Sequence, residues 1–153
     1  VYIDDPAWGQ IGSYGRFRYV YSIDSITGED IYIDGSAEGI IWGGNLLTVS
    51  SLCGQDFIPD EDFIFFTEDL DQTVEIIDKM FQQLFNIATF SEHCKGIVIG
   101  DFLNTNNVEW LKELFRTFKC PTVGGFKITH ASDKITIPVG RHAELKSKKL
   151  IIK

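Results

Sequence analysis

A short, wholly apolar run followed by a long amphipathic pattern is the feature that most limits how this chain can fold. The run spans Phe63 to Phe66, and a strand that is apolar at every position is buried on both faces, as strands of α/β sheets are. Apolar residues then recur at three- and four-residue intervals, which predicts a helix near residues 71–89. We therefore expect a buried strand that leads into a helix packed on a sheet.

The same order of strand and helix precedes this unit. Residues 38–42 have a strand pattern, and Gly43-Gly44-Asn45 permits a sharp turn after them. Leu46, Leu47, Val49 and Leu52 then share one helical face, which ends at Gly54. Two consecutive units of this kind are typical of an α/β domain.

The rest of the chain adds further strands and one more helix. Residues 96–100 predict a buried strand, and Asn106 or Asn107 can cap a helix that extends towards Phe118. The remaining strand candidates are residues 121–123, 135–137 and 143–152. The sequence therefore predicts an α/β fold with a mixed sheet and two or three helices.

The N-terminal part has a different character. Residues 1–16 contain Pro6 and three glycines without helical or strand periodicity, so we expect a connecting segment there and a folded domain over 17–153. Residues 17–23 and 31–33 have strand patterns on either side of a turn at 27–30, which predicts a β-hairpin or meander. Because the chain starts with Val1 rather than Met, we expect it to be the C-terminal piece of a longer protein.

Charge and cysteine content narrow the class of protein. The 14 basic and 22 acidic residues give a net charge of −8, which disfavours a nucleic-acid partner. Cys53, Cys94 and Cys120 are odd in number and in no CxxC pattern, so neither a disulfide framework nor a zinc site is predicted. No apolar run is long enough to cross a bilayer. We expect a cytoplasmic protein with no membrane contact, no metal and no other cofactor.

Two ionisable residues stand at the ends of apolar segments. Glu68 comes just after the run 63–66, at the strand end where ligands bind in α/β sheets, and His130 follows the strand-like residues 126–129. A carboxylate and an imidazole can act as the orienting group and the base of an active site. In the alternative interpretation, Glu68 and Asp69 stabilise the first turn of a helix, and His130 is a surface or structural histidine.

Weaker candidates could bind a substrate. Gly43, Gly44 and Asn45 could present backbone N–H groups and an amide at a helix N-terminus, although the same residues could simply form a tight turn capped by Asn45. Asp101 follows the apolar residues 96–100, where it could contact a ligand or cap the next loop. No serine has the strand-to-helix setting expected of a nucleophile. The candidates therefore amount to half of an active site.

The order of these segments resembles the C-terminal domain of the LD-carboxypeptidase family. These serine peptidases include muramoyltetrapeptide carboxypeptidases and microcin C immunity peptidases. The stretches that carry the resemblance are Glu38-Gly-Ile-Ile-Trp-Gly-Gly-Asn-Leu46, Phe63-Ile-Phe-Phe-Thr-Glu-Asp69, Ile77-Asp-Lys-Met80, Gly96-Ile-Val-Ile-Gly-Asp-Phe102, Pro121-Thr-Val-Gly-Gly-Phe126, His130 and Thr136-Ile-Pro-Val-Gly140. Residues 126–134 depart from the family's glycine-rich pattern, which predicts a differently shaped loop beside His130.

The resemblance implies a fold, an activity and partners. It implies a swivelling β/β/α domain and a Ser-Glu-His triad in which Glu68 and His130 belong to this chain and the serine to a missing N-terminal domain. The intact enzyme would hydrolyse the amide before a terminal D-amino acid in murein tetrapeptides during cell-wall recycling. A microcin-immunity-like peptidase acting on peptidyl or aminoacyl nucleotides and a non-catalytic binding module are the alternatives. The isolated domain would be inactive, and a homodimer is plausible.

The resemblance also leads to a geometric prediction. Glu68 and His130 should lie on adjacent strand ends, with a carboxylate oxygen about 3 Å from one imidazole nitrogen. Side chains pointing to opposite faces of the sheet would contradict a shared site.

Overall fold

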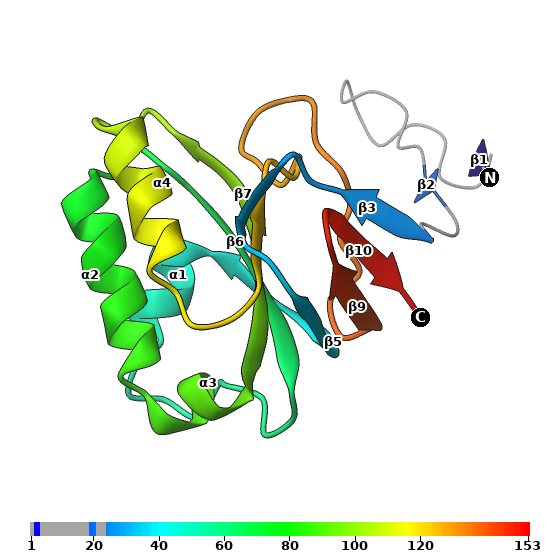
Figure 1. Cartoon of the computed structure of the whole chain (residues 1–153), viewed down its shortest axis with the longest axis horizontal. Coiled ribbons are helices and arrows are strands. Elements are labelled where there is room, and N and C mark those ends of the chain that lie inside the picture. Colours follow the sequence, from blue (N-terminus) through cyan, green and yellow to red (C-terminus); the bar gives the residue numbers. More distant parts are fainter. Residues whose placement is uncertain (1, 4–18, 21–23) are drawn as a thin grey trace, which may run out of the picture.

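Three of the predicted apolar runs form neighbouring parallel strands at the centre of the fold (Figure 1). The computed structural model describes residues 2–3, 19–20 and 24–153. The central strands are β5 (Ser36–Asn45), β6 (Phe63–Leu70) and β7 (Cys94–Leu103), and each extends beyond the residues that predicted it. The apolar runs therefore marked the strands correctly and underestimated their length.

The main sheet has eight strands in the order β3-β10-β9-β5-β6-β7-β8-β4. Its remaining members are β3 (Ser25–Thr27), β4 (Asp30–Ile33), β8 (Thr122–Gly124), β9 (His142–Lys146) and β10 (Lys149–Ile152). Strands β5 to β8 pair in parallel, whereas the other pairs are antiparallel. The predicted mixed α/β fold is confirmed.

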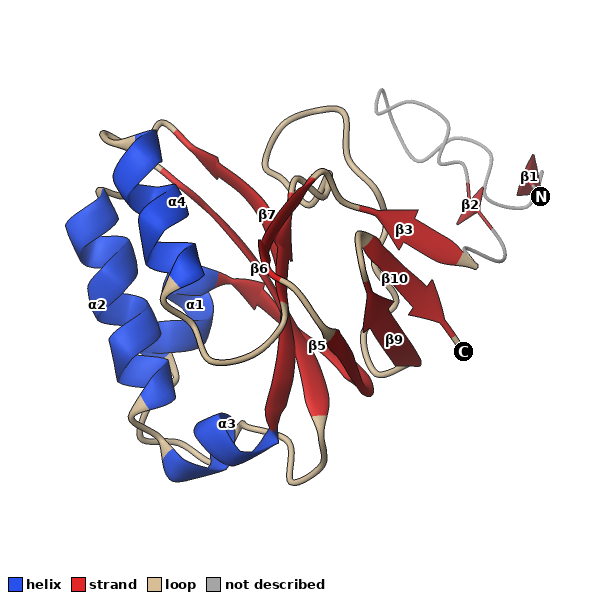
Figure 2. Cartoon of the chain, viewed as in Figure 1, coloured by secondary structure: helices blue, strands red, loops and turns tan. Residues whose placement is uncertain are grey.

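The helices pack on one face of this sheet, as Figure 2 shows for α1 (Leu46–Ser51), α2 (Val74–Phe85) and α4 (Val108–Arg116). Asn107 caps α4, as predicted, because its side chain accepts a hydrogen bond from the Trp110 amide. The described residues contain a fourth helix, α3 (Ala88–His93), so the prediction of two or three was wrong. Six residues are too few for helical periodicity to stand out.

The side chains of β6 point alternately into two apolar cores on opposite faces of the strand. Phe63 and Phe65 pack in a cluster with the helices. Ile64 and Phe66 belong to a second cluster with residues of β3, β9 and β10. Because successive side chains of a strand point to opposite faces, the central strands form a middle layer between helices and further strands. This β/β/α arrangement agrees with the architecture expected from the family resemblance.

The sheet curves until its two edges meet. Strands β3 and β4 are separated by Gly28 and Glu29 alone, yet they lie at opposite ends of the strand order. Gly28 N donates to Lys148 O at 2.7 Å, and Glu29 N donates to Gly124 O at 2.8 Å. The predicted strand at 31–33 is present in β4, but it pairs with β8 rather than in a local hairpin. Residues 25–27, which no strand pattern predicted, form β3 and pair with β10.

Two C-terminal predictions also need correction. Residues 135–137 are not a strand, and Ile135 and Ile137 instead pack on the second core from an irregular segment. Residues 143–152 were expected to form one strand, but they lie in the antiparallel pair β9 and β10. Ser147 has a φ of 51°, which makes the turn between these strands possible.

The predicted leader, residues 1–16, lies outside the described residues except for Tyr2–Ile3. These two residues form β1, which pairs antiparallel with β2 (Tyr19–Val20) in a separate two-stranded sheet. The predicted strand at 17–23 is likewise described only at Tyr19–Val20. Across the described ranges, no helix has the length and apolar character needed to cross a membrane.

Candidate active site

Glu68 lies within β6 rather than at the start of a helix. Strand β6 continues to Leu70, and α2 begins only at Val74, so the interpretation of Glu68 and Asp69 as residues of the first helical turn is wrong. Residue Glu68 is only 8% exposed, although charged side chains are rarely buried without a partner. The partners of its carboxylate therefore determine what the residue can do.

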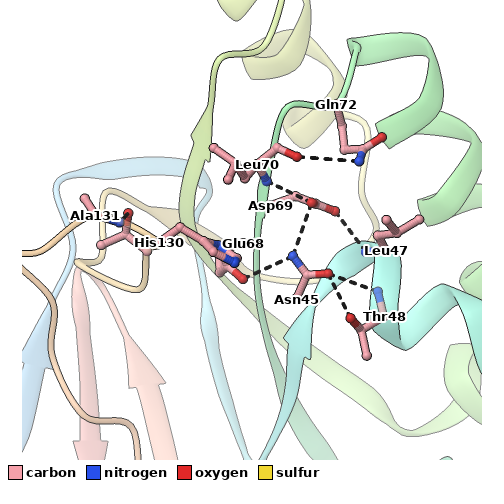
Figure 3. A network of polar contacts seen from close by, with 10 residues as sticks. Asn45, Leu47, Thr48, Glu68, Asp69, Leu70, Gln72, His130 and Ala131 are labelled. Carbon is pink, nitrogen blue, oxygen red and sulfur yellow. Dashed lines mark hydrogen bonds and ion pairs between the residues drawn. The ribbon is translucent and has the colours of Figure 1, made fainter.

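His130 is one of these partners. Its Nδ1 lies 2.5 Å from Glu68 Oε2, and Figure 3 shows the two side chains meeting between β6 and the loop that carries His130. The glutamate side chain is 10% exposed, whereas the imidazole is 48% exposed. Because the carboxylate contacts Nδ1, the ring presents Nε2 away from Glu68. This is how an orienting carboxylate holds a catalytic histidine.

The loop before His130 is fixed by the neighbouring strand β7. Ile128 O accepts a hydrogen bond from Asp101 N at 2.9 Å, and Phe126 N donates to Ile99 O at 3.3 Å. A Cβ on Gly100 would lie 2.1 Å from Ile128 O, so only glycine allows the loop to approach β7 so closely. The prediction of a strand at residues 126–129 was wrong, and so was the placement of His130 at a strand end. The predicted contact with Glu68 is nevertheless present.

Asn45 connects Glu68 to a second carboxylate. Its Nδ2 donates to Glu68 Oε1 at 3.3 Å and to Asp69 Oδ1 at 3.2 Å, as Figure 3 shows. Asn45 Oδ1 meanwhile accepts from Thr48 N at 3.0 Å, which makes this residue the N-cap of α1. Both oxygens of Glu68 are therefore engaged, one by Asn45 and one by His130.

Asp69 is the site residue that sequence reasoning did not identify. Its Oδ2 accepts a hydrogen bond from Leu47 N at 2.9 Å at the start of α1. Adjacent residues of a strand point to opposite faces, which explains why Glu68 reaches the His130 loop while Asp69 reaches α1. The signal was present in the sequence as a second carboxylate beside Glu68, but it was assigned to a helix that begins later.

The other predicted substrate-binding residues lie at the same end of the sheet. Gly43-Gly44-Asn45 is not a turn, because all three residues belong to β5. Gly43 has a φ of 146°, and a Cβ there would lie 2.0 Å from Phe66 O, so this glycine is required by the close approach of β6. Gly44 has more space, with its nearest contact at 3.7 Å from an added Cβ. Asp101 is partly buried and holds the His130 loop through its amide.

The described residues hold no group of three or more His, Cys, Asp or Glu side chains placed to bind a metal ion. The arrangement at the ends of β5 and β6 is instead a hydrogen-bonded chain of an amide, two carboxylates and a half-exposed imidazole. Such a chain can set the tautomer and the orientation of His130.

Comparison with known proteins identifies the class of protein to which this site belongs. Residues 38–145 match the family described as LD-carboxypeptidase C-terminal domain. The chain belongs to this family, as the order of its segments indicated.

Several individual relatives are similar to the chain. A Bacillus subtilis (strain 168) protein with the name "Probable murein peptide carboxypeptidase" is 30% identical over 140 residues, which cover 85% of this chain and 43% of that protein. The microcin C7 self-immunity protein MccF of Escherichia coli is 27% identical over 118 residues, or 71% of this chain and 34% of that protein.

A solved structure supports the same family and fold. The muramoyltetrapeptide carboxypeptidase from Oxalobacter formigenes superposes with a TM-score of 0.70 at 28% identity, covering 84% of this chain and 49% of that chain. This chain thus spans between about a third and a half of the length of the relatives named here.

Proposed function

We propose that this chain supplies the glutamate and histidine of a Ser-Glu-His triad in an LD-carboxypeptidase, and that a separate N-terminal domain supplies the serine. The observation that carries the proposal is the 2.5 Å contact between Glu68 Oε2 and His130 Nδ1. The contact joins a buried carboxylate to a half-exposed imidazole, so one end of the pair is fixed and the other can reach a substrate.

In the proposed mechanism His130 transfers protons and Glu68 positions it. With its Nδ1 proton held by Glu68, the ring has a free lone pair on Nε2. Nε2 accepts the proton of the serine hydroxyl as its oxygen attacks the amide carbonyl, and later returns that proton to the leaving amine. Glu68 remains ionised throughout and stabilises the imidazolium that forms between these steps.

Asn45 and Gly44 give the site its substrate-facing edge in this proposal. Asn45 holds Glu68 and Asp69 together, and Gly44 has no side chain of its own beside them. Together with Asp101 on β7, these residues lie where bound ligands meet the carboxyl ends of parallel strands. Gly43 contributes by packing against β6 rather than by touching substrate.

The proposed substrate is a murein tetrapeptide, cleaved at the amide between an L-centre and its terminal D-amino acid. This choice follows from two relatives, one named as a murein peptide carboxypeptidase and one as a muramoyltetrapeptide carboxypeptidase. The second candidate is a peptidyl or aminoacyl nucleotide, favoured by the similarity to a microcin C7 self-immunity protein. Assays of the full-length protein with each of the two substrate types, measured side by side, distinguish the two activities.

The triad is tested by replacing its members in the full-length protein. Glu68→Gln and His130→Ala should each lower kcat/KM by about a thousandfold or more. The double variant should fall to about the same residual rate, because members of a triad act as one unit. His142→Ala changes an exposed histidine of β9 and serves as the matched control, with activity unchanged.

Two results would count against the triad. If the double variant lost kcat/KM by the product of the two single losses, Glu68 and His130 would not act on the same step. Hydrolysis of neither substrate by a folded full-length protein would instead favour a non-catalytic binding module, in which the pair is only structural.

A further inference from the structure

Cys94 and Cys120 are far apart in the sequence but adjacent in the fold. Cys94 begins β7, and Cys120 lies two residues before β8, its parallel neighbour. The register pairs Ile97 with Thr122, and Ile97 N also donates to Pro121 O at 2.8 Å. Both cysteines therefore stand at the beginnings of neighbouring parallel strands, just before the paired residues Ile97 and Thr122.

The two thiols also contact each other, and the contact makes them unequal. The two thiols interact through a side-chain hydrogen bond, which lowers the pKa of Cys120 against the opposing effect of burial. The same hydrogen bond and the burial of Cys94 raise the pKa of Cys94. Cys120 is partly exposed whereas Cys94 is buried, and a thiol with a lowered pKa reacts more readily near neutral pH, so Cys120 is the attacking partner.

Both cysteines line a cavity of about 350 Å³ between α2, α3 and the segment that joins α4 to β8. Its lining includes the polar side chains of Gln82, Asn86 and Ser91 and the cationic side chain of Lys119. A space of this size admits a small molecule. Cys94 pairs with Phe63 at the beginning of β6, whereas Glu68 lies near the end of that strand, so the cavity is separate from the candidate active site.

We propose that the cavity is a thiol–disulfide exchange site, in which Cys120 attacks a low-molecular-weight disulfide and Cys94 resolves the product. The Cys120 thiolate forms a bond to one sulfur of the small disulfide and releases the other as a thiolate. Cys94 then loses its proton to water and attacks Cys120 Sγ, which breaks the mixed disulfide. The two cysteines end as an intramolecular disulfide, and the small disulfide is reduced to two thiols.

The test uses glutathione disulfide as the probe and the native chain as the protein. After incubation at neutral pH and trapping of free thiols with N-ethylmaleimide, peptide mapping should recover Cys94 and Cys120 in one disulfide-linked peptide. Cys53 is an internal control because burial raises its pKa. Cys120 should react at least about tenfold faster than Cys53.

Variants identify the order of the steps. Cys94→Ser should stop at the mixed disulfide between Cys120 and glutathione, and Cys53→Ser should behave like the unaltered protein. Cys120→Ser should leave Cys94 reduced. The proposal is overturned if native peptide maps show glutathione on Cys53 while Cys94 and Cys120 stay reduced. It is equally overturned if Cys120→Ser lets Cys94 react at the native rate.

Discussion

Replacing Asn45 by alanine removes polar contacts that reach in two directions from the end of β5. Two contacts reach α1, because Asn45 Oδ1 accepts from Thr48 N at 3.0 Å, which caps the helix, and from Thr48 Oγ1 at 3.1 Å. The other two run from Asn45 Nδ2 to Glu68 Oε1 at 3.3 Å and to Asp69 Oδ1 at 3.2 Å. The substitution therefore removes the hydrogen bonds by which Asn45 links Glu68 and Asp69 to α1.

The expected loss of stability is about 3 kcal/mol. Removing an asparagine cap costs about 1 kcal/mol. Hydrogen bonds to charged groups contribute about 1.5–3 kcal/mol when short and buried, and about 1 kcal/mol each is appropriate for these long, partly buried ones. Urea unfolding should show this loss of about 3 kcal/mol, and the thermal midpoint should fall by about 10 °C for a domain of this size.

Asn107→Ala is the matched control for the cap. Asn107 caps α4 in the same way, with its Oδ1 accepting from Trp110 N at 3.1 Å. We expect this variant to lose about 1 kcal/mol, which is the cost of a cap alone. The reasoning is refuted if the two variants differ by less than about 0.5 kcal/mol, because the bridge to the carboxylates would then contribute nothing measurable.

Three further outcomes follow from close contacts and thiol chemistry. Gly43→Ala places a Cβ 2.0 Å from a carbonyl oxygen of β6 and should lower the free energy of unfolding by about 3 kcal/mol. In Gly44→Ala the nearest atom, on Val49, lies 3.7 Å from the new Cβ, so the loss should be less than about 1 kcal/mol. Equal thermal midpoints for the two variants would contradict this. Gly100→Ala should displace the His130 loop and lower the activity of the folded full-length enzyme about tenfold or more, and unchanged kcat/KM would argue against loop positioning. Because the pKa of Cys120 is lowered and that of Cys53 is raised, iodoacetamide should alkylate Cys120 with a midpoint at lower pH than Cys53, and the reverse order would show that the thiols have been misassigned.

The central strands and the larger helices could be predicted because their signals are local. The run from Phe63 to Phe66 is apolar at every position, and the spacing of apolar residues in α2 fits one helical face. The length of β6 could not be predicted. Residues 67–70 stay extended because the first two pair with β5 and all but Glu68 pair with β7. Such pairing leaves no trace in the composition of a single segment.

The sequence predicted some residues of the candidate site but not the shape of the loop that carries His130. Glu68 and His130 were both candidates because each follows an apolar segment, and the family resemblance gave each of them a place in the triad. The shape of the His130 loop depends on Gly100 and on backbone hydrogen bonds to β7, which no periodic pattern encodes. The contact between Cys94 and Cys120 escaped notice for the same reason, because only the β7–β8 register brings these residues together.

The closure of the sheet has a consequence for how the chain folds. Ile26 in β3 pairs with Leu150 in β10, so residues from the two ends of the described domain must meet before the sheet is complete. Contacts between such distant residues slow folding, because the ends of a long loop have to be brought together first. During synthesis on the ribosome, β3 is made well before its partner β10. Until β10 is available, the backbone hydrogen-bonding groups of β3 can pair with other chains. Closing the sheet at Gly28 and Glu29 thus removes an aggregation-prone edge only after β10 has been synthesised.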